Sequence, residues 1–144
     1  MSIPTKFYLA GPMSGIPQAN FPAFAEAAAY LRSLGAEIVS PAEMDSPEIV
    51  AETMADATGT VHAEQWGEFL ARDVKLVADE VDGIVCLPGF ADSRGARLEC
   101  FVALLCNKPV FMFNCYEWSG MTRIPTSQVQ AACAGVPLLE EKST

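Results

Sequence analysis

Glu99 is the only ionisable residue in an otherwise apolar stretch, LECFVALLC, at residues 98–106. A helix that is apolar on every side is expected to be buried, and a buried carboxylate without a partner is costly. Such a group is either a structural carboxylate, hydrogen-bonded to a neighbouring loop, or part of a functional site. Glu99 is therefore the first candidate for chemistry.

Asp73 is a second carboxylate that the sequence pattern directs inward. Apolar residues recur at helical spacing from Trp66 onward, and Asp73 falls within their stripe. The neighbouring Arg72 and Lys75 are expected to turn toward solvent. Asp73 either pairs with an arginine or a backbone amide at the edge of the core, or it forms a catalytic pair with Glu99.

Tyr8 lies near the end of a short β-type run, KFYLA, at residues 6–10. Its phenol can reach a carboxylate at that edge of the sheet. The alternative is an ordinary core tyrosine whose hydroxyl is hydrogen-bonded.

Two short segments can bind an anion through backbone amides. GPMSG, at residues 11–15, places two glycines around a small hydroxyl where a strand turns into a helix. It is neither a GxGxxG nor a Walker loop. DSRG, at residues 92–95, opens a later helix. There, Ser93 with Arg94 or Arg97 can receive a phosphate, or Asp92 or Ser93 can be merely a helix cap.

The elements that must position these residues alternate between strand and helix. Asn20 suits the N-cap of the first helix, and Gly35 suits its C-terminal end. The pattern predicts one domain, residues 1–144, with an α/β, flavodoxin-like (Rossmann-like) parallel sheet and helices on both faces. Strands are expected at residues 6–10, 36–40, 83–87 and 109–113, and helices at 21–34, 63–80, 93–106 and about 127–134.

Ligands of such folds bind beyond the carboxyl ends of the strands. The loops at residues 11–20, 40–62, 88–93 and 114–123 are therefore the places to look for a site. Residues 41–61 are acidic, broken by Pro47 and Gly59, and long for a connection. They favour a lid or binding loop that can include one helical turn.

Composition excludes several classes of protein. Hydrophobic residues make up 51% of the 144 residues, which excludes a disordered chain. Nine basic against 18 acidic residues give a net charge of −9, which disfavours nucleic acid as a partner. No apolar run approaches the roughly 18–20 residues that span a bilayer, and the first residues lack a signal-peptide layout. We expect a cytoplasmic protein with no membrane partner.

The cysteines and the histidine indicate no metal centre. The five cysteines are odd in number and form no CxxC, which favours buried reduced thiols over disulfides. His62 is the only histidine, so a histidine-based zinc site cannot form and a catalytic Cys–His pair has little support. We expect neither a metal nor another cofactor.

Three segments together resemble the nucleoside 2-deoxyribosyltransferase superfamily, which includes the 2′-deoxynucleoside 5′-monophosphate N-glycosidases. The segments are FYLAGPMSG, ARDVKLVADEVDGIV and DSRGARLE followed by NKPV, and they span about residues 6–113. The resemblance implies that Glu99 is the nucleophile, that Tyr8 orients it, and that Asp73 contacts the sugar or assists the leaving base.

The resemblance also implies residues that bind the substrate. Ser93 matches a serine that holds the 5′-phosphate, and Asp92 is offset by one from an aspartate of the transferases. Gly11 and Gly15 match the loop that faces the substrate. Ser14 in that loop stands where the N-glycosidases carry an arginine.

The implied function is cleavage or exchange of the N-glycosidic bond of a (deoxy)nucleoside or, better, its 5′-monophosphate. Hydrolysis is favoured over transfer because Ser93 suggests a phosphate-bearing substrate. The alternative is a protein that binds a nucleotide or nucleotide-derived signal without turnover. Cys100 and Phe101 replace the Leu-Gly that follows the family's nucleophile, which leaves this alternative open. A flavodoxin-like electron carrier or a receiver domain has little support, since neither a flavin-phosphate loop nor a receiver's acidic cluster occurs.

The resemblance further implies a homo-oligomer, a dimer or larger, in which a neighbour's C-terminal segment completes the pocket. Residues 118–121 are the candidate for this segment, with Ser119 as a substrate-binding residue.

Overall fold

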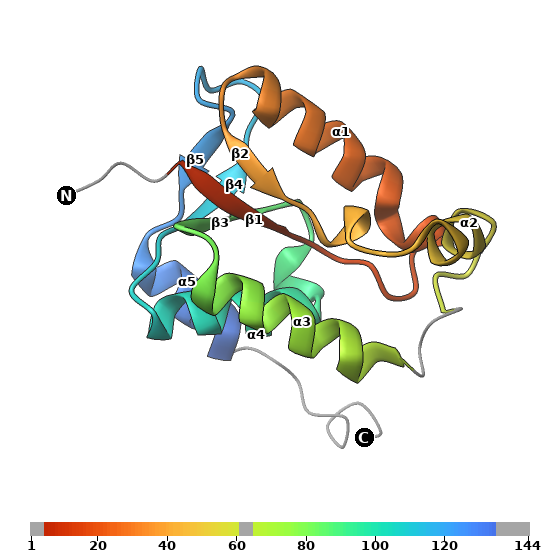
Figure 1. Ribbon diagram of the computed structural model, residues 1–144. Coiled ribbons are helices and arrows are strands. Elements are labelled where there is room, and N and C mark those ends of the chain that lie inside the picture. Colours follow the sequence, from red (N-terminus) through yellow and green to blue (C-terminus); the bar gives the residue numbers. More distant parts are fainter. Residues whose placement is uncertain (1–4, 61–64, 135–144) are drawn as a thin grey trace.

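A computed structural model describes residues 5–60 and 65–134 of the chain. Its strands form one five-stranded sheet in the order β2-β1-β3-β4-β5, the strand order of a flavodoxin-like α/β fold (Figure 1). The first four strands are parallel, and β5 is antiparallel to β4. The elements are β1 (Lys6–Ala10), α1 (Phe21–Ser33), β2 (Glu37–Val39), α2 (Pro47–Met54), α3 (Trp66–Asp79), β3 (Gly83–Cys86), α4 (Arg94–Leu105), β4 (Val110–Phe113), β5 (Met121–Arg123) and α5 (Thr126–Ala134).

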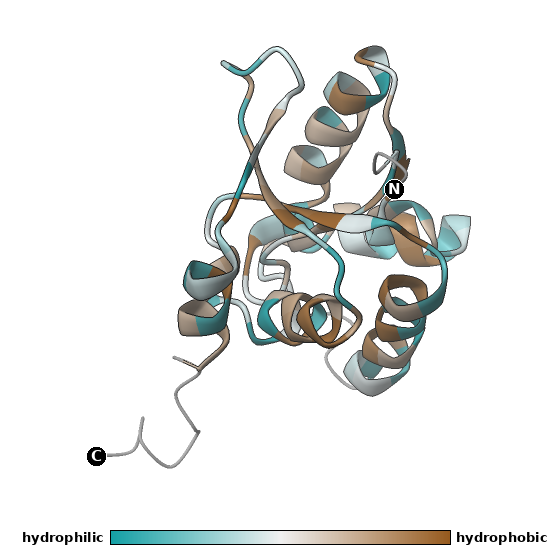
Figure 2. Cartoon of the chain, turned by 90° about the vertical axis from the view of Figure 1, so that its left-hand side faces the viewer, coloured by the Kyte–Doolittle hydropathy of each residue, from teal (hydrophilic) through white to brown (hydrophobic). Residues whose placement is uncertain are grey.

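The two faces of the sheet bury separate cores. Successive side chains of a strand point to opposite faces, so Phe7 and Leu9 of β1 pack beneath α1. Tyr8 and Ala10 point to the other face, into the core that α3, α4 and α5 cover. Figure 2 shows hydrophobic residues on the central strands and on parts of the helices that cover them. The alternation along β1 therefore decides which helices Tyr8 can meet.

The expected alternation of strands and helices is confirmed, with two corrections. Residues 41–61, expected as a loop that can include one helical turn, contain the eight-residue helix α2. The Ser46 hydroxyl caps this helix by accepting from the Ile49 N–H. The tail forms the antiparallel edge strand β5, which was not expected. The expected start of α3 at residues 63–64 lies outside the described residues.

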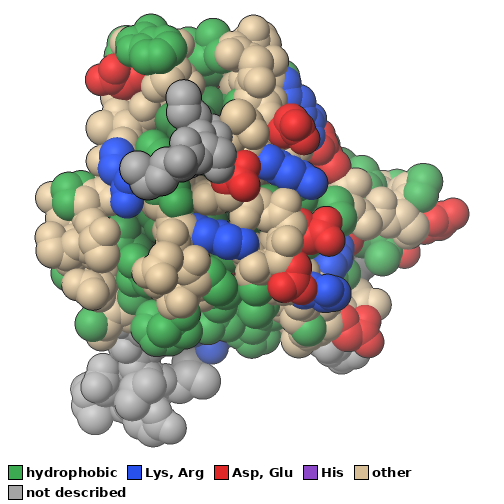
Figure 3. Space-filling view, turned by 60° about the vertical axis from the view of Figure 1, so that its left-hand side comes forward, with side chains coloured by type: hydrophobic (Ala, Val, Ile, Leu, Met, Phe, Trp, Pro, Cys, Tyr) green, Lys and Arg blue, Asp and Glu red, His purple; other side chains and the backbone are tan. Residues whose placement is uncertain are grey.

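The expectation that the helix around Glu99 is buried on all sides is wrong for one face. Leu98, Phe101 and Leu105 of α4 are exposed, and hydrophobic side chains are visible at the surface in Figure 3. The opposite side of α4, with Glu99 and Cys100, is buried against the sheet. Within the described residues, no helix has both the length and the apolar character that crossing a membrane requires.

The loop after β1 holds three consecutive residues in the left-handed region. Gln18, Ala19 and Asn20 have φ angles of 59°, 49° and 63°. Asn20 was expected to cap α1, but its side chain makes no cap bond and instead donates from Nδ2 to the Pro12 carbonyl at 3.0 Å. The Gln18 N–H donates to the Asp56 carbonyl at 2.7 Å, so the segment after α2 helps to hold this conformation.

Replacing Ala19 by glycine is expected to stabilise the protein. A non-glycine residue in the left-handed conformation destabilises the folded state by about 1–2 kcal/mol. Glycine avoids this cost, but its greater freedom in the unfolded state destabilises the fold by about 0.5–1 kcal/mol. Ala19→Gly should therefore raise the unfolding free energy in urea by about 0.5–1 kcal/mol. The matched control Ala29→Gly, at an exposed position inside α1, should lower it by about 1 kcal/mol. If both variants lower the unfolding free energy by the same amount, the left-handed conformation of Ala19 does not strain the fold.

Candidate functional site

A cavity of about 780 Å³ opens at the carboxyl end of β1. Its walls come from the loop after β1, the start of α1, the segment between β2 and α3, α3 itself, the start of α4, and α5. A volume of several hundred Å³ is typical of small-molecule sites. This edge of the sheet is also where ligands of doubly wound folds bind.

Tyr8 and Glu99 meet at the buried end of this cavity. The Tyr8 hydroxyl donates to Glu99 Oε2 at 2.6 Å, and both side chains are buried. β1 directs Tyr8 toward the helices, and α4 crosses this face with Glu99 on its inner side. The hydrogen bond supplies the partner that a carboxyl group in an apolar helix requires.

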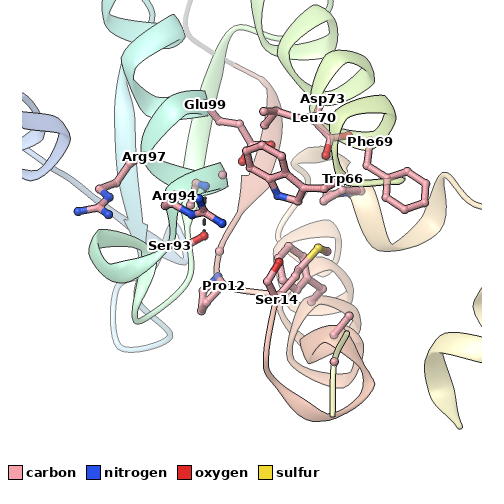
Figure 4. Close-up of a pocket in the computed structure, with 18 of the residues that line it drawn as sticks. Pro12, Ser14, Trp66, Phe69, Leu70, Asp73, Ser93, Arg94, Arg97 and Glu99 are labelled. Carbon is pink, nitrogen blue, oxygen red and sulfur yellow. Dashed lines mark hydrogen bonds between the residues drawn. The ribbon is translucent and has the colours of Figure 1, made fainter. Parts of the chain in front are cut away.

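Asp73 approaches the same place from α3. It is buried, its side chain reaches into the cavity from α3 (Figure 4), and its charge acts on Glu99. Arg72 was expected to turn toward solvent, and this expectation is wrong. Its Nε donates to Asp73 Oδ1 at 2.9 Å, and its Nη1 donates to Asp45 Oδ1 at 2.7 Å. The structure thus brings Tyr8, Asp73 and Glu99 together and adds two charged neighbours.

Burial dominates the electrostatics of Glu99. It raises the pKa of the Glu99 carboxyl well above its usual range, because the charged form loses its hydration. The hydrogen bond from Tyr8 lowers this pKa, and the negative charge of Asp73 raises it again. The pKa of Tyr8 is also well above its usual range, first through burial and then through Glu99. The phenol therefore remains a neutral donor.

The pKa of Asp73 is likewise raised by burial, but Arg72 opposes the change. The hydrogen bond and charge of Arg72 lower the pKa, as does hydrogen bonding with Tyr8. The charges of Asp73 and Glu99 act on each other, so the two carboxyl groups titrate as a pair. The pKa of Glu99 is raised further than that of Asp73, so in the free site the single proton of the pair lies on Glu99 and Asp73 carries the charge.

The candidate residues of the first loop divide into two groups. Gly11 and Ser14 line the cavity, whereas Gly15 is not among the lining residues and its N–H donates to the Gly59 carbonyl at 3.1 Å. Gly11 also has a packing role, because a Cβ there would lie 2.9 Å from the Leu87 Cβ. Gly11 is therefore needed for close packing whether or not a ligand binds.

The start of α4 forms another wall. Asp92 and Ser93 line the cavity, and the Ser93 hydroxyl accepts from the Ala96 N–H at 3.2 Å as the N-cap of α4. The hydroxyl hydrogen of Ser93 stays available to donate to a ligand. Arg94 stacks on Trp66 across the cavity mouth, with its guanidinium carbon 5.4 Å from the ring centroid.

Two other candidates lie away from the carboxyl pair. Arg97 borders the cavity, but its guanidinium points away from Ser93 and Arg94 (Figure 4). Ser119 lies between β4 and β5, where its hydroxyl donates to the Met121 carbonyl at 2.9 Å. Ser119 does not line the cavity of its own chain.

Sequence reasoning missed Asp45, Arg72 as a site residue, and the aromatic wall of Trp66 and Phe69. The helical spacing of apolar residues that begins at Trp66 predicts packing positions for Trp66 and Phe69, yet both line the cavity. No motif marked Asp45, whose partner is 27 positions later. Among residues 5–60 and 65–134, no group of three or more His, Cys, Asp or Glu side chains is placed to hold a metal ion. His62 lies outside these residues.

Comparison with known proteins gives a family but no activity. Residues 5–112 match the family described as "Domain of unknown function (DUF4406)". The chain belongs to this family. No curated protein shows significant similarity to it. The matched region contains β1, α3 and α4, and with them Tyr8, Asp73 and Glu99. The resemblance to the nucleoside 2-deoxyribosyltransferase superfamily stays a prediction.

The raised pKa of Glu99 predicts how this family member's stability depends on pH. A carboxyl whose pKa is higher in the folded than in the unfolded state stabilises the fold fully below the unfolded pKa. That stability is lost as pH rises toward the folded pKa, at about 1.4 kcal/mol for each unit of pKa difference. Glu99→Gln keeps an acceptor for Tyr8 but cannot ionise. Its melting temperature should exceed that of the wild type by more at pH 8 than at pH 4.5.

The control is Glu26→Gln, at an exposed position of α1, for which the difference from wild type should be small at both pH values. A Glu99→Gln difference that does not depend on pH would show that folding does not change the proton affinity of Glu99.

Proposed function

We propose that the protein cleaves the N-glycosidic bond of a deoxynucleoside 5′-monophosphate, with Glu99 as the nucleophile. The observation that carries this proposal is the Tyr8–Glu99 hydrogen bond of 2.6 Å at the buried end of a ligand-sized cavity. Asp73 in the same cavity supplies the second carboxyl group that glycosidic chemistry uses. The likeness of the three sequence segments to the N-glycosidases supports the choice of substrate.

In the first step, the Glu99 carboxylate attacks the anomeric carbon of the sugar. The bond from that carbon to the nucleobase breaks, and its electron pair leaves with the base. Once the single proton of the pair has moved from Glu99 to Asp73, Asp73 gives it to the departing base. The transition state resembles an oxocarbenium ion, which the negative charge of Glu99 stabilises. Tyr8 holds the Glu99 carboxylate in place by donating to Oε2.

In the second step, water attacks the anomeric carbon and its proton passes to the Asp73 carboxylate. The bond between the sugar and Glu99 breaks, which regenerates the Glu99 carboxylate and the protonated Asp73. The products are the free base and the sugar 5-phosphate. A second nucleobase in place of water would make the same site a transferase.

The walls of the cavity suit the two ends of such a substrate. Trp66 and Phe69 offer aromatic faces to a nucleobase, and Ser93 and Arg94 offer donors to a phosphate. The contribution of residues 118–121 from a neighbouring copy, including Ser119, stays a prediction.

Removing the nucleophile should abolish base release without unfolding the protein. Glu99→Gln should lower kcat by at least about 1,000-fold, equivalent to a loss of about 4 kcal/mol of transition-state stabilisation. The assay incubates purified protein with each deoxynucleoside 5′-monophosphate and measures the free base by chromatography. Glu26→Gln, at an exposed position of α1 that does not line the cavity, should retain the wild-type rate.

Wild-type rates in Glu99→Gln would remove Glu99 from the mechanism. If the wild-type protein retains a nucleotide but releases no base, the site binds without turnover, and the catalytic proposal is wrong.

A substitution at Ser93 can test the proposed contact with the phosphate without removing the N-cap of α4. Ser93→Asp keeps an N-cap acceptor for the Ala96 N–H but places a negative charge beside the phosphate. A charge-assisted hydrogen bond contributes about 1.5–3 kcal/mol, so wild type should prefer the monophosphate over the nucleoside about tenfold or more in kcat/KM. Ser93→Asp should lose this preference while its melting temperature stays near that of wild type. Equal kcat/KM for both substrates in wild type would favour a nucleoside transferase.

A further inference from the structure

The segment between β2 and α3 reaches the carboxyl pair through one residue, Asp45. Asp45 lies between the short 3-10 turn at Pro41–Glu43 and α2, and it lines the cavity. Its side chain is only 9% exposed and accepts from Arg72 Nη1 at 2.7 Å. A carboxylate this well buried, paired with an arginine of another element, fixes where that arginine points.

Arg72 uses separate N–H groups for its two carboxylate partners. Nη1 contacts Asp45, and Nε contacts Asp73 at 2.9 Å. The guanidinium also lies over the Phe69 ring, 5.3 Å from its centroid. The planar guanidinium has donors at fixed angles, so occupation of one edge by Asp45 orients the edge that faces Asp73.

The groups that act on Asp73 come from four elements. Arg72 is on its own helix, Asp45 precedes α2, Tyr8 is on β1 and Glu99 is on α4. Arg72 is the only cation among them. Its position therefore decides how strongly the ionised form of Asp73 is favoured over the protonated form.

We propose that Asp45 is a positioning residue that holds the Arg72 guanidinium on Asp73 and thereby sets the pH at which the Asp73–Glu99 pair carries its single proton. On the proposed function, which this inference extends, the acidic segment before α2 would control the pH range of base release. Asp45 touches no reacting atom and acts through Arg72.

Two effects of Asp45 on Asp73 have opposite signs, which makes the role testable. The negative charge of Asp45 acts directly to raise the pKa of Asp73, so its removal alone would move the Asp73 titration to lower pH. Without Asp45 to hold it, the Arg72 guanidinium would contact Asp73 less closely. The loss of this stronger, attractive effect would move the Asp73 titration to higher pH. Positioning therefore predicts an upward shift, and simple electrostatics predicts a downward one.

The experiment follows the side-chain carboxyl carbon of Asp73 by NMR during a pH titration of the full-length protein without ligand. Arg72→Gln should raise the Asp73 midpoint by about one pH unit or more, since a contacting opposite charge lowers a carboxyl pKa by about 1–3. Asp45→Asn should raise it by a smaller amount. The double variant should not exceed Arg72→Gln, because Asp45 acts through Arg72.

An Asp45→Asn midpoint that is unchanged or lower overturns the proposal, as does a double variant whose shift is the sum of the two single shifts. Asp79→Asn is the matched control, because it breaks an exposed pair with Lys75 on the same helix and should leave the Asp73 midpoint unchanged. If Asp45→Asn does not fold, Arg72→Lys replaces it. Lysine keeps the positive charge at position 72 but lacks the planar guanidinium that contacts Asp45 and Asp73 at the same time. An Asp73 midpoint equal to that of the wild type would overturn the proposal.

This titration is independent of catalysis. If no nucleotide releases its base but the Asp73 midpoint moves as expected, the proposed function fails and the positioning role stands. If base is released, the pH profile of kcat/KM in Asp45→Asn should shift in the same direction as the Asp73 midpoint. If the pH profile of kcat/KM in Asp45→Asn equals that of the wild type, Asp45 does not control the pH range of base release, and that part of the proposal is wrong.

Discussion

The hydrogen bond between Tyr8 and Glu99 is the contact on which the arrangement of the site depends. It joins β1 to α4 across 91 positions of sequence. Glu99 lies in an apolar helix against the sheet, where an unpartnered carboxyl group would be costly. Tyr8 can meet it only because β1 turns alternate side chains to α1 and to α4. A one-residue slip in the pairing of β1 would place Tyr8 on the wrong face.

The position of Asp73 follows from the same layer arrangement. α3 precedes β3 and α4 follows it, and the two helices pack side by side on one face of the sheet. The inner side of α3 carries Asp73, and the inner side of α4 carries Glu99, so both approach the end of β1. Bringing two carboxyl groups together raises their proton affinity, and Arg72 partly offsets this for Asp73.

Periodicity and alternation predicted the fold and the core of the site, but not its electrostatic surroundings. The inward position of Asp73 followed from a helical stripe, and the meeting of Tyr8 with Glu99 was expected from the place of Tyr8 near the end of its strand and from the family resemblance. The contact of Arg72 with Asp73 did not follow from the sequence pattern, because a long side chain next to an inward-facing residue can extend toward solvent or toward the core. Asp45 lies in a segment without periodicity, so nothing local marked it. β5 is three residues long and gave no strand pattern.

Burial of Glu99 imposes a condition on the proposed chemistry. A nucleophilic carboxylate must be ionised, yet its surroundings favour the neutral form. In the free site this cost opposes ionisation, and Arg72 contacts Asp73 but acts on Glu99 only through its charge, which lowers the pKa of Glu99. An oxocarbenium-like transition state brings positive charge next to Glu99, which is buried, and burial strengthens the attraction between the two charges. The ionised Glu99 is then better matched to the transition state than to the free site, which is the difference in binding on which catalysis depends.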